Sequence, residues 1–163
     1  MLKVPEKHEI MELMDCPCYP SLPVDWYWFC NHAKIFRKVD KKTSKELSER
    51  HECKPKECYH NTWTSDITGR YRYFEGYVRS LGLPLMTAHS WLVDSKGNVI
   101  DPTLIIDIPK DKYGKAIKNR CGDVYIGIEM PRDWINKTAF KLKRTGDFME
   151  MYHDKLNGGS KNE

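Results

Sequence analysis

A histidine and an aspartate could meet on one face of a short β-hairpin. The stretch MTAHSWLVDSKGNVIDPT carries His89 and Asp101, and its apolar and polar residues alternate as in two β-strands. A three-residue SKG loop, with Gly97 in the left-handed conformation, would place Val93 opposite Val99. In that register His89 and Asp101 are diagonal neighbours, and a slip of one residue would separate them.

An aspartate beside a histidine orients the imidazole so that its second nitrogen can exchange a proton with a nucleophile. Cys58 is the candidate nucleophile, because it falls in the first turn of a helix expected after Pro55. Unpaired backbone amides and the positive end of the helix dipole favour a thiolate there. The alternative is a buried structural thiol and a His–Asp pair that only satisfy one another. Together the three groups indicate cysteine-based acyl transfer.

The strings ECYHNTW, YFEGYV, HSWLVD and VIDPT follow one another within about residues 55–130. In this order they resemble the core of the transglutaminase-like branch of the papain-like cysteine enzymes. The resemblance implies a helix that begins with the nucleophilic cysteine and packs on an antiparallel sheet. It implies that Cys58 is the nucleophile, that His89 is the general base and acid, and that Asp101 orients His89.

The reaction implied by this resemblance is cleavage or transfer at an amide or ester bond, as in a peptidase, a deamidase or a transglutaminase-type enzyme. We therefore expect a peptide, a protein or a small amide as substrate. We expect no cofactor.

The oxyanion donor is not fixed by these motifs. The chain contains no glutamine, so it lacks the side-chain donor that papain-type proteases place before the cysteine. The backbone amide of Cys58, helped by Asn31, Asn61 or Tyr59, is the expected substitute. Asn61 lies one turn beyond Cys58 on the same helical face.

Two residues on the expected strands could support the site from nearby. Trp91 should share the strand face of His89. Glu75 could partner His89 or Arg72, or it could simply be solvated.

A zinc site is an alternative use of the cysteines near the start of the chain. The available soft ligands are Cys16, Cys18, Cys30 and His32, with His51 and Cys53 further on. Their spacing is not the usual two-residue kind, and a helix would point Cys30 and His32 apart. We therefore expect no metal, and unpaired thiols at Cys16, Cys18, Cys30 and Cys53.

A non-catalytic binding module on the same fold is the alternative function. Its partner would be a protein or a nucleic acid, the latter held by aromatic and basic residues at Tyr71, Arg72, Tyr73, Lys141, Lys143 and Arg144. The 27 basic and 23 acidic residues give a net charge of only +4, so we do not expect nucleic-acid binding.

The order of the expected elements, helices first and antiparallel strands later, predicts the α+β class. Helices are expected over residues 6–14, 25–38, 55–69, 131–140 and 147–156, and strands over 71–78, 88–94, 98–102 and 123–130. The charged segment 38–50 should be a solvated helix or loop, and 106–123 a polar connection.

The length of 163 residues suits one papain-like α+β domain over residues 1–156, followed by a flexible tail at 157–163. No apolar run approaches the length of a membrane span, and the first residues lack the pattern of a secretory signal. We therefore expect a cytoplasmic protein with no membrane partner.

Overall fold

The computed structural model describes residues 4–14, 25–80, 86–106, 113 and 122–158. Its helices are α1 (Val4–Met14), α2 (Trp26–His32), α3 (Lys41–Arg50), α4 (Cys58–Ser65), α5 (Arg132–Leu142) and α6 (Met149–Leu156). Its strands are β1 (Lys34–Phe36), β2 (Arg72–Ser80), β3 (Met86–Val93), β4 (Val99–Ile100) and β5 (Gly122–Met130). The protein is therefore of the predicted α+β class. Within the described part of the chain, no helix is both long enough and apolar enough to cross a bilayer.

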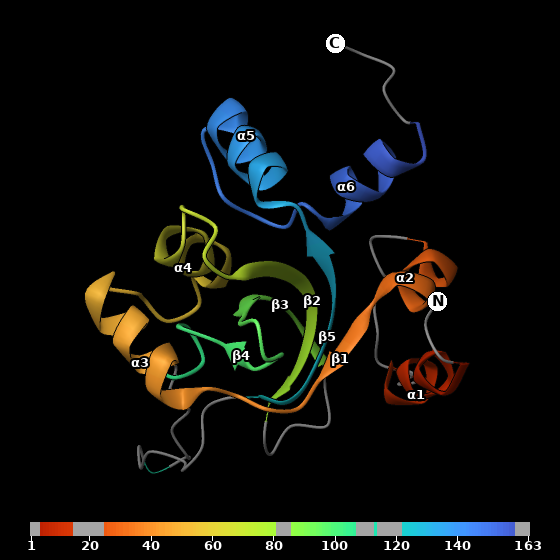
Figure 1. Ribbon diagram of the computed structural model, residues 1–163, viewed down its shortest axis with the longest axis horizontal. Helices are drawn as coiled ribbons and strands as arrows, with labels where there is room; N and C mark the ends of the chain where they lie inside the picture. The colour runs from red at the N-terminus through yellow and green to blue at the C-terminus, as the bar shows by residue number, and fades with distance from the viewer. Residues whose placement is uncertain (1–3, 15–24, 81–85, 107–112, 114–121, 159–163) are drawn as a thin grey trace.

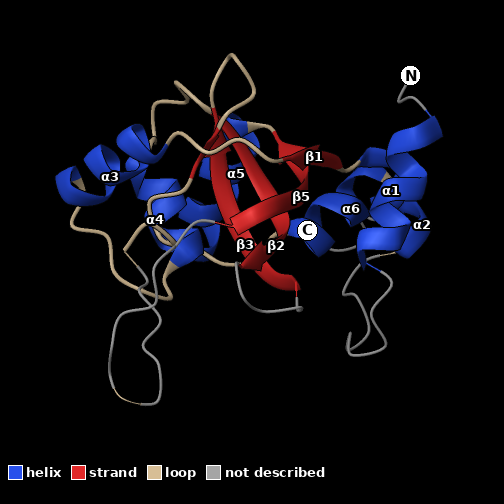
Figure 2. Ribbon diagram, turned by 90° about the horizontal axis from the view of Figure 1, so that it is seen from below, coloured by secondary structure: helices blue, strands red, loops and turns tan. Residues whose placement is uncertain are grey.

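The five strands form one curled antiparallel sheet in the order β1-β5-β2-β3-β4. Helices α3 and α4 lie at one side of this sheet and α1 and α2 at the other (Figure 1). The view from below shows the same separation (Figure 2). The chain that follows β1 also reaches β4, since Val99 donates to the Lys38 carbonyl and accepts from the Asp40 amide, both at 2.8 Å. These bonds join the two edges of the sheet.

Alternation along the strands separates two apolar clusters. The larger cluster packs the sheet against helices α1, α2, α5 and α6 and includes Tyr73 and Tyr77. The smaller cluster lies on the opposite face, and its buried members are Phe74, Val78, Trp91, Val93, Val99 and Tyr125. His89 belongs to this second face, because it stands two residues before Trp91 on β3.

The helix predicted over residues 25–38 is wrong in its second half. It begins as expected behind Asp25, whose carboxylate accepts from the Trp28 amide at 2.7 Å. It ends at His32, and Ala33 turns to extended backbone. The following residues form β1, in which Ile35 pairs with Ile126 of β5. Pairing with a distant strand outweighs the local helical pattern here.

The charged segment 38–50 contains helix α3, and that helix is not fully solvated. The Asp40 carboxylate caps it by accepting from the Thr43 amide at 3.0 Å. One face is buried and consists of Ser44, Leu47 and Ser48. This spacing of three and four residues places the buried face against the sheet.

Several predictions fall on residues outside the described part of the chain. They concern Cys16, Cys18, most of the connection over 106–123, and residues 159–163 of the expected tail.

Candidate active site

Cys58 lies in the first turn of α4, as predicted, but the helix spans Cys58–Ser65 and is shorter at both ends than the expected 55–69. The first amides of a helix have no helical acceptor, so a thiolate at this position faces free N–H donors. The thiol is unpaired and half-buried. It lines a pocket of about 290 Å³, called here the Cys58 pocket.

His89 and Asp101 meet in the predicted register. Val93 pairs with Val99, and Gly97 adopts a φ of 84° in the loop between the strands. The Nε2 atom of His89 lies 2.9 Å from Oδ2 of Asp101, and the two side chains are 5% and 0% exposed. Burial keeps water from competing for this hydrogen bond.

Among the described residues, four hydrogen bonds hold the carboxylate of Asp101. Oδ2 faces His89 and also accepts from the Tyr125 hydroxyl at 2.9 Å. Oδ1 accepts from the amides of Thr103 at 3.0 Å and Leu104 at 2.9 Å. Burial acts to raise the pKa of Asp101, but the charge of His89 and these bonds outweigh it and hold the pKa below its usual value. Asp101 is therefore a fixed carboxylate.

The second ring nitrogen of His89 is left for Cys58, since Nε2 is engaged by Asp101. Burial acts to raise the pKa of the Cys58 thiol, but a hydrogen bond with His89, the charge of that ring and the Ser90 amide together lower it below 9.0. Burial acts to lower the pKa of His89, but Asp101 and Cys58 raise it to about 10. These shifts favour a thiolate beside an imidazolium.

Helix α4 brings the thiol to His89 because part of the β3 edge is open. Strand β4 pairs with Leu92 and Val93, and no other described strand pairs with Ser90 on that side. The Ser90 carbonyl accepts instead from the Thr62 hydroxyl of α4 at 3.0 Å. This hydrogen bond holds α4 against the part of β3 that β4 does not cover.

The Cys58 pocket joins the reactive groups to a small apolar surface. Its lining consists of Cys58 and His89 together with Lys56, Val78, Thr87, Ala88, Thr103 and Leu104. A carbonyl carbon that entered it would lie beside both the thiol and the imidazole.

Asn61 supports the site, but it is not free to stabilise an oxyanion. Its Nδ2 donates to the Lys54 carbonyl at 2.7 Å and to the Thr103 hydroxyl at 2.9 Å. Its Oδ1 accepts from the Lys54 amide at 3.2 Å. The buried amide therefore ties the loop before α4 to the segment after Asp101.

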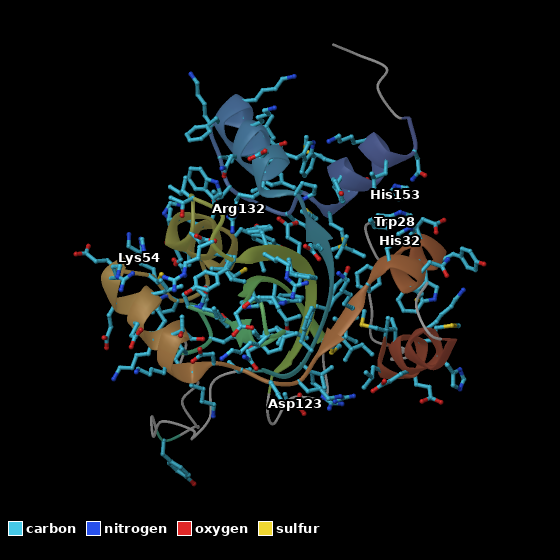
Figure 3. All side chains as sticks on the ribbon, viewed as in Figure 1. Trp28, His32, Lys54, Asp123, Arg132 and His153 are labelled. Carbon is cyan, nitrogen blue, oxygen red and sulfur yellow. The ribbon has the colours of Figure 1, made fainter. Side chains whose placement is uncertain are left out.

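Tyr59 and Asn31 do not line the Cys58 pocket. Burial, followed by the charges of Asp147 and Glu75, raises the pKa of the half-buried Tyr59 phenol. Asn31 belongs to α2 on the far side of the sheet, where it lines a different pocket. Figure 3 shows Trp28, another residue of that pocket, on the opposite side of the sheet from α4. The expectation of an Asn31 donor therefore needs correction, since α2 ends early and packs elsewhere.

Glu75 is neither solvated nor a partner of His89 or Arg72. It is fully buried, and it accepts from the Tyr73 hydroxyl at 2.9 Å and from the Phe148 amide at 2.7 Å. Alternation places it on the face opposite His89. Its role is to bind the start of α6 to the sheet.

Trp91 packs beside the imidazole of His89 on the same face of β3. It is fully buried and nearly parallel to the His89 ring, with centroids 6.4 Å apart and an interplanar angle of 16°. Its indole lies over Gly127, where an added Cβ would come within 2.6 Å of the ring. Glycine at that position therefore makes room for Trp91, and Trp91 fixes the orientation of His89 by packing.

Sequence reasoning missed two residues that hold Asp101, namely Ser44 and Tyr125. The Ser44 hydroxyl accepts from the Asp101 amide at 2.9 Å and donates to the Asp40 carbonyl at 2.6 Å. The alternation in DVYIGIEM could have placed Tyr125 on the face of His89. No pattern in the charged segment around Ser44 indicated its contact.

Tyr125→Phe should lower the free energy of unfolding by about 1–3 kcal/mol. The hydroxyl donates to Asp101 and accepts from the Gly122 amide at 2.9 Å, so its removal leaves buried polar groups without a partner. Urea unfolding followed by fluorescence measures the difference. Tyr27→Phe is the control, because Tyr27 is 69% exposed and should give no change. Equal losses in both variants would contradict the structural role of Tyr125.

The cysteines and histidines of the zinc alternative are not brought together in the described residues. Cys30 is buried in the core, where burial raises the pKa of its thiol. His32 has Nδ1 at 2.7 Å from the Trp28 carbonyl. Cys30 and Cys53 are free, as predicted. Among the residues that the structure describes, no three metal-ligating side chains lie close enough to share an ion.

The residues considered for nucleic-acid binding do not form one surface. Tyr73 is 2% exposed, so its ring cannot stack on a base. Arg72 pairs with Glu129 at 3.5 Å. Only Lys141, Lys143 and Arg144 stand together, at the end of α5.

The fold and the site define an α+β protein in which one helix on a curled antiparallel sheet joins a cysteine, a histidine and an aspartate in a chain of contacts. Comparisons with protein-family models, with curated proteins and with solved structures gave no significant match.

Proposed function

We propose that the protein is a cysteine-dependent acyl-transfer enzyme of the transglutaminase-like, papain-like type. It acts on an amide or ester bond of a peptide, a protein or a small amide. The contact from Cys58 through His89 to Asp101, beside a pocket of about 290 Å³, is the observation that carries this proposal. A binding module would not require a buried imidazole between a thiol and a carboxylate.

The reaction follows from the positions of these groups. The Cys58 thiolate attacks the carbonyl carbon, and a carbon–sulfur bond forms. His89 gives its proton to the leaving amine or alcohol as the carbon–nitrogen or carbon–oxygen bond breaks. Water or an amine then attacks the thioester and gives a proton to His89, and the thiolate leaves. The backbone amide of Cys58 can donate to the oxyanion, because it stands at the start of α4.

The proposal predicts that Cys58 reacts with iodoacetamide at a lower pH than an ordinary thiol. A lowered Cys58 pKa and a raised His89 pKa mean that the thiolate persists as the pH falls, until the pH passes the lowered Cys58 value. His89→Ala removes the imidazolium, so the reaction should then require a higher pH. We expect at least a tenfold slower reaction near pH 7, about one pKa unit of lost thiolate stabilisation. Intact-mass kinetics with peptide mapping measures it.

Cys53 is the internal control in the same samples. It is free and half-buried, and burial raises the pKa of its thiol, so it should react slowly in both proteins. Alkylation of Cys58 at the rate of Cys53, or with no effect of His89→Ala, would contradict the proposed activation.

A further inference from the structure

A second hollow lies between helices α4 and α5, away from Cys58 and His89, and is called here the α4–α5 cleft. Its volume is about 290 Å³. The side chains that matter are His60 and Trp63 of α4, Phe140 of α5, and Lys143 and Arg144 just after α5. None of these residues lines the Cys58 pocket. Figure 1 shows α5 beside α4.

The cleft has an aromatic wall that is open to solvent. Phe140 is 64% exposed, which is unusual for a large apolar ring. It stands edge-on to Trp63, with centroids 5.5 Å apart and an interplanar angle of 75°. Trp63 is fixed in turn, because its Nε1 donates to the side-chain Oδ1 of Asn136 at 3.0 Å. An apolar side chain from a ligand could therefore pack against a prearranged surface.

The rim of the cleft is positively charged. Lys143 and Arg144 line it, and Lys141 stands on the last turn of α5. Cations at a helix C-terminus interact favourably with its dipole, which accounts for part of this arrangement. However, among the described residues none of the three forms an ion pair, and no acidic side chain lines the cleft. The guanidinium of Arg144 lies 5.9 Å from the centroid of the Phe148 ring, but this contact does not neutralise its charge, so all three cations can still pair with a ligand.

We propose that the α4–α5 cleft binds an acidic peptide segment that carries one apolar side chain. The apolar side chain packs against Phe140 and Trp63, and flanking carboxylates pair with Lys143 and Arg144. A peptide is favoured over a nucleic acid because the rings of Trp63 and Phe140 already stand edge-on to each other, and Tyr73 is buried, so neither place offers a free face for a stacked base. Binding at this site requires no turnover, so it stands apart from the proposed chemistry of Cys58.

Fluorescence anisotropy tests the cleft with a labelled pool of octapeptides that contain glutamates around one leucine, phenylalanine or tyrosine. We expect saturable binding that weakens as salt is added. Phe140→Ala and the double variant Lys143→Glu/Arg144→Glu should each raise the Kd at least fivefold. Both changes affect exposed side chains, and circular dichroism checks that the variants are folded.

Matched controls distinguish binding in the cleft from nonspecific electrostatic or apolar binding elsewhere on the surface. Lys137→Glu changes an exposed lysine of α5 outside the cleft, and Met151→Ala removes a 40% exposed apolar side chain of α6. Each should change the Kd less than twofold. No binding at millimolar peptide, equal effects of control and cleft variants, or stronger binding of a single-stranded oligonucleotide of equal charge would each overturn the proposal.

Discussion

Cys58→Ala is expected to abolish turnover of any acyl substrate and to remove the thioester adduct from intact-mass spectra. The thiol forms the only covalent bond to the acyl group in the proposed reaction, so no other group can replace it. Substrate affinity should stay largely unchanged, because the substitution removes one sulfur atom from the lining of the pocket. Probe adducts, turnover and substrate Kd in wild type and variant together measure these effects.

Cys53→Ala is the matched control, since it removes a second free and half-buried thiol outside the Cys58 pocket. It should retain activity. If Cys58→Ala is folded and as active as wild type, the thiol-enzyme proposal fails and the chain is better understood as a binding protein.

Asp101→Asn should reduce turnover by about three to four orders of magnitude, as loss of the orienting aspartate does in serine proteases. The amide can donate as well as accept, so it can hold His89 in the wrong tautomer. It also carries no charge to stabilise the imidazolium. The backbone amides of Thr103 and Leu104 can donate to the Oδ1 of an asparagine as they do to Asp101, so the variant should remain folded. Turnover and the unfolding midpoint, measured on the same preparation, distinguish a chemical from a structural effect.

Asp94→Asn controls for the loss of a carboxylate in the same hairpin. Asp94 accepts from the amides of Lys96 and Asn98 in the loop and does not contact His89. Its replacement should change turnover less than twofold. Comparable losses in the two variants would show that hairpin stability, not the orientation of His89, limits the reaction.

The hairpin and the start of α4 could be predicted because their signals are local. Gly97 supplies the left-handed residue that the loop needs, and alternation then fixes which side chains share the face of His89. Pro55 similarly marks the helix that begins at Cys58. These short-range features gave the predicted contact between His89 and Asp101.

The parts that could not be predicted depend on partners far away in the sequence. Phe36 fits the apolar stripe of a helix over 25–38 as well as a strand, and pairing with Tyr125 of β5 selects the strand. In the sequence Ser44 is one polar residue in a charged segment, and its hydrogen bond with the Asp101 amide depends on the packing of α3. Glu75 could have been solvated, and the distant Phe148 amide explains its burial. In each case tertiary contacts decided among conformations that the local sequence permits.

The joined edges of the sheet bear on the order in which the molecule can fold. Strand β4 has only two residues, and it is held on one side by β3 and on the other by Lys38 and Asp40. Asp101 follows it directly and binds Ser44, which lies 57 residues earlier in the chain. Contacts of such sequence separation form slowly, because a long loop must close first. A fragment limited to residues 55–130 would keep the four partners of the Asp101 carboxylate, but it would lack the Ser44 acceptor of the Asp101 amide and the chain that flanks β4.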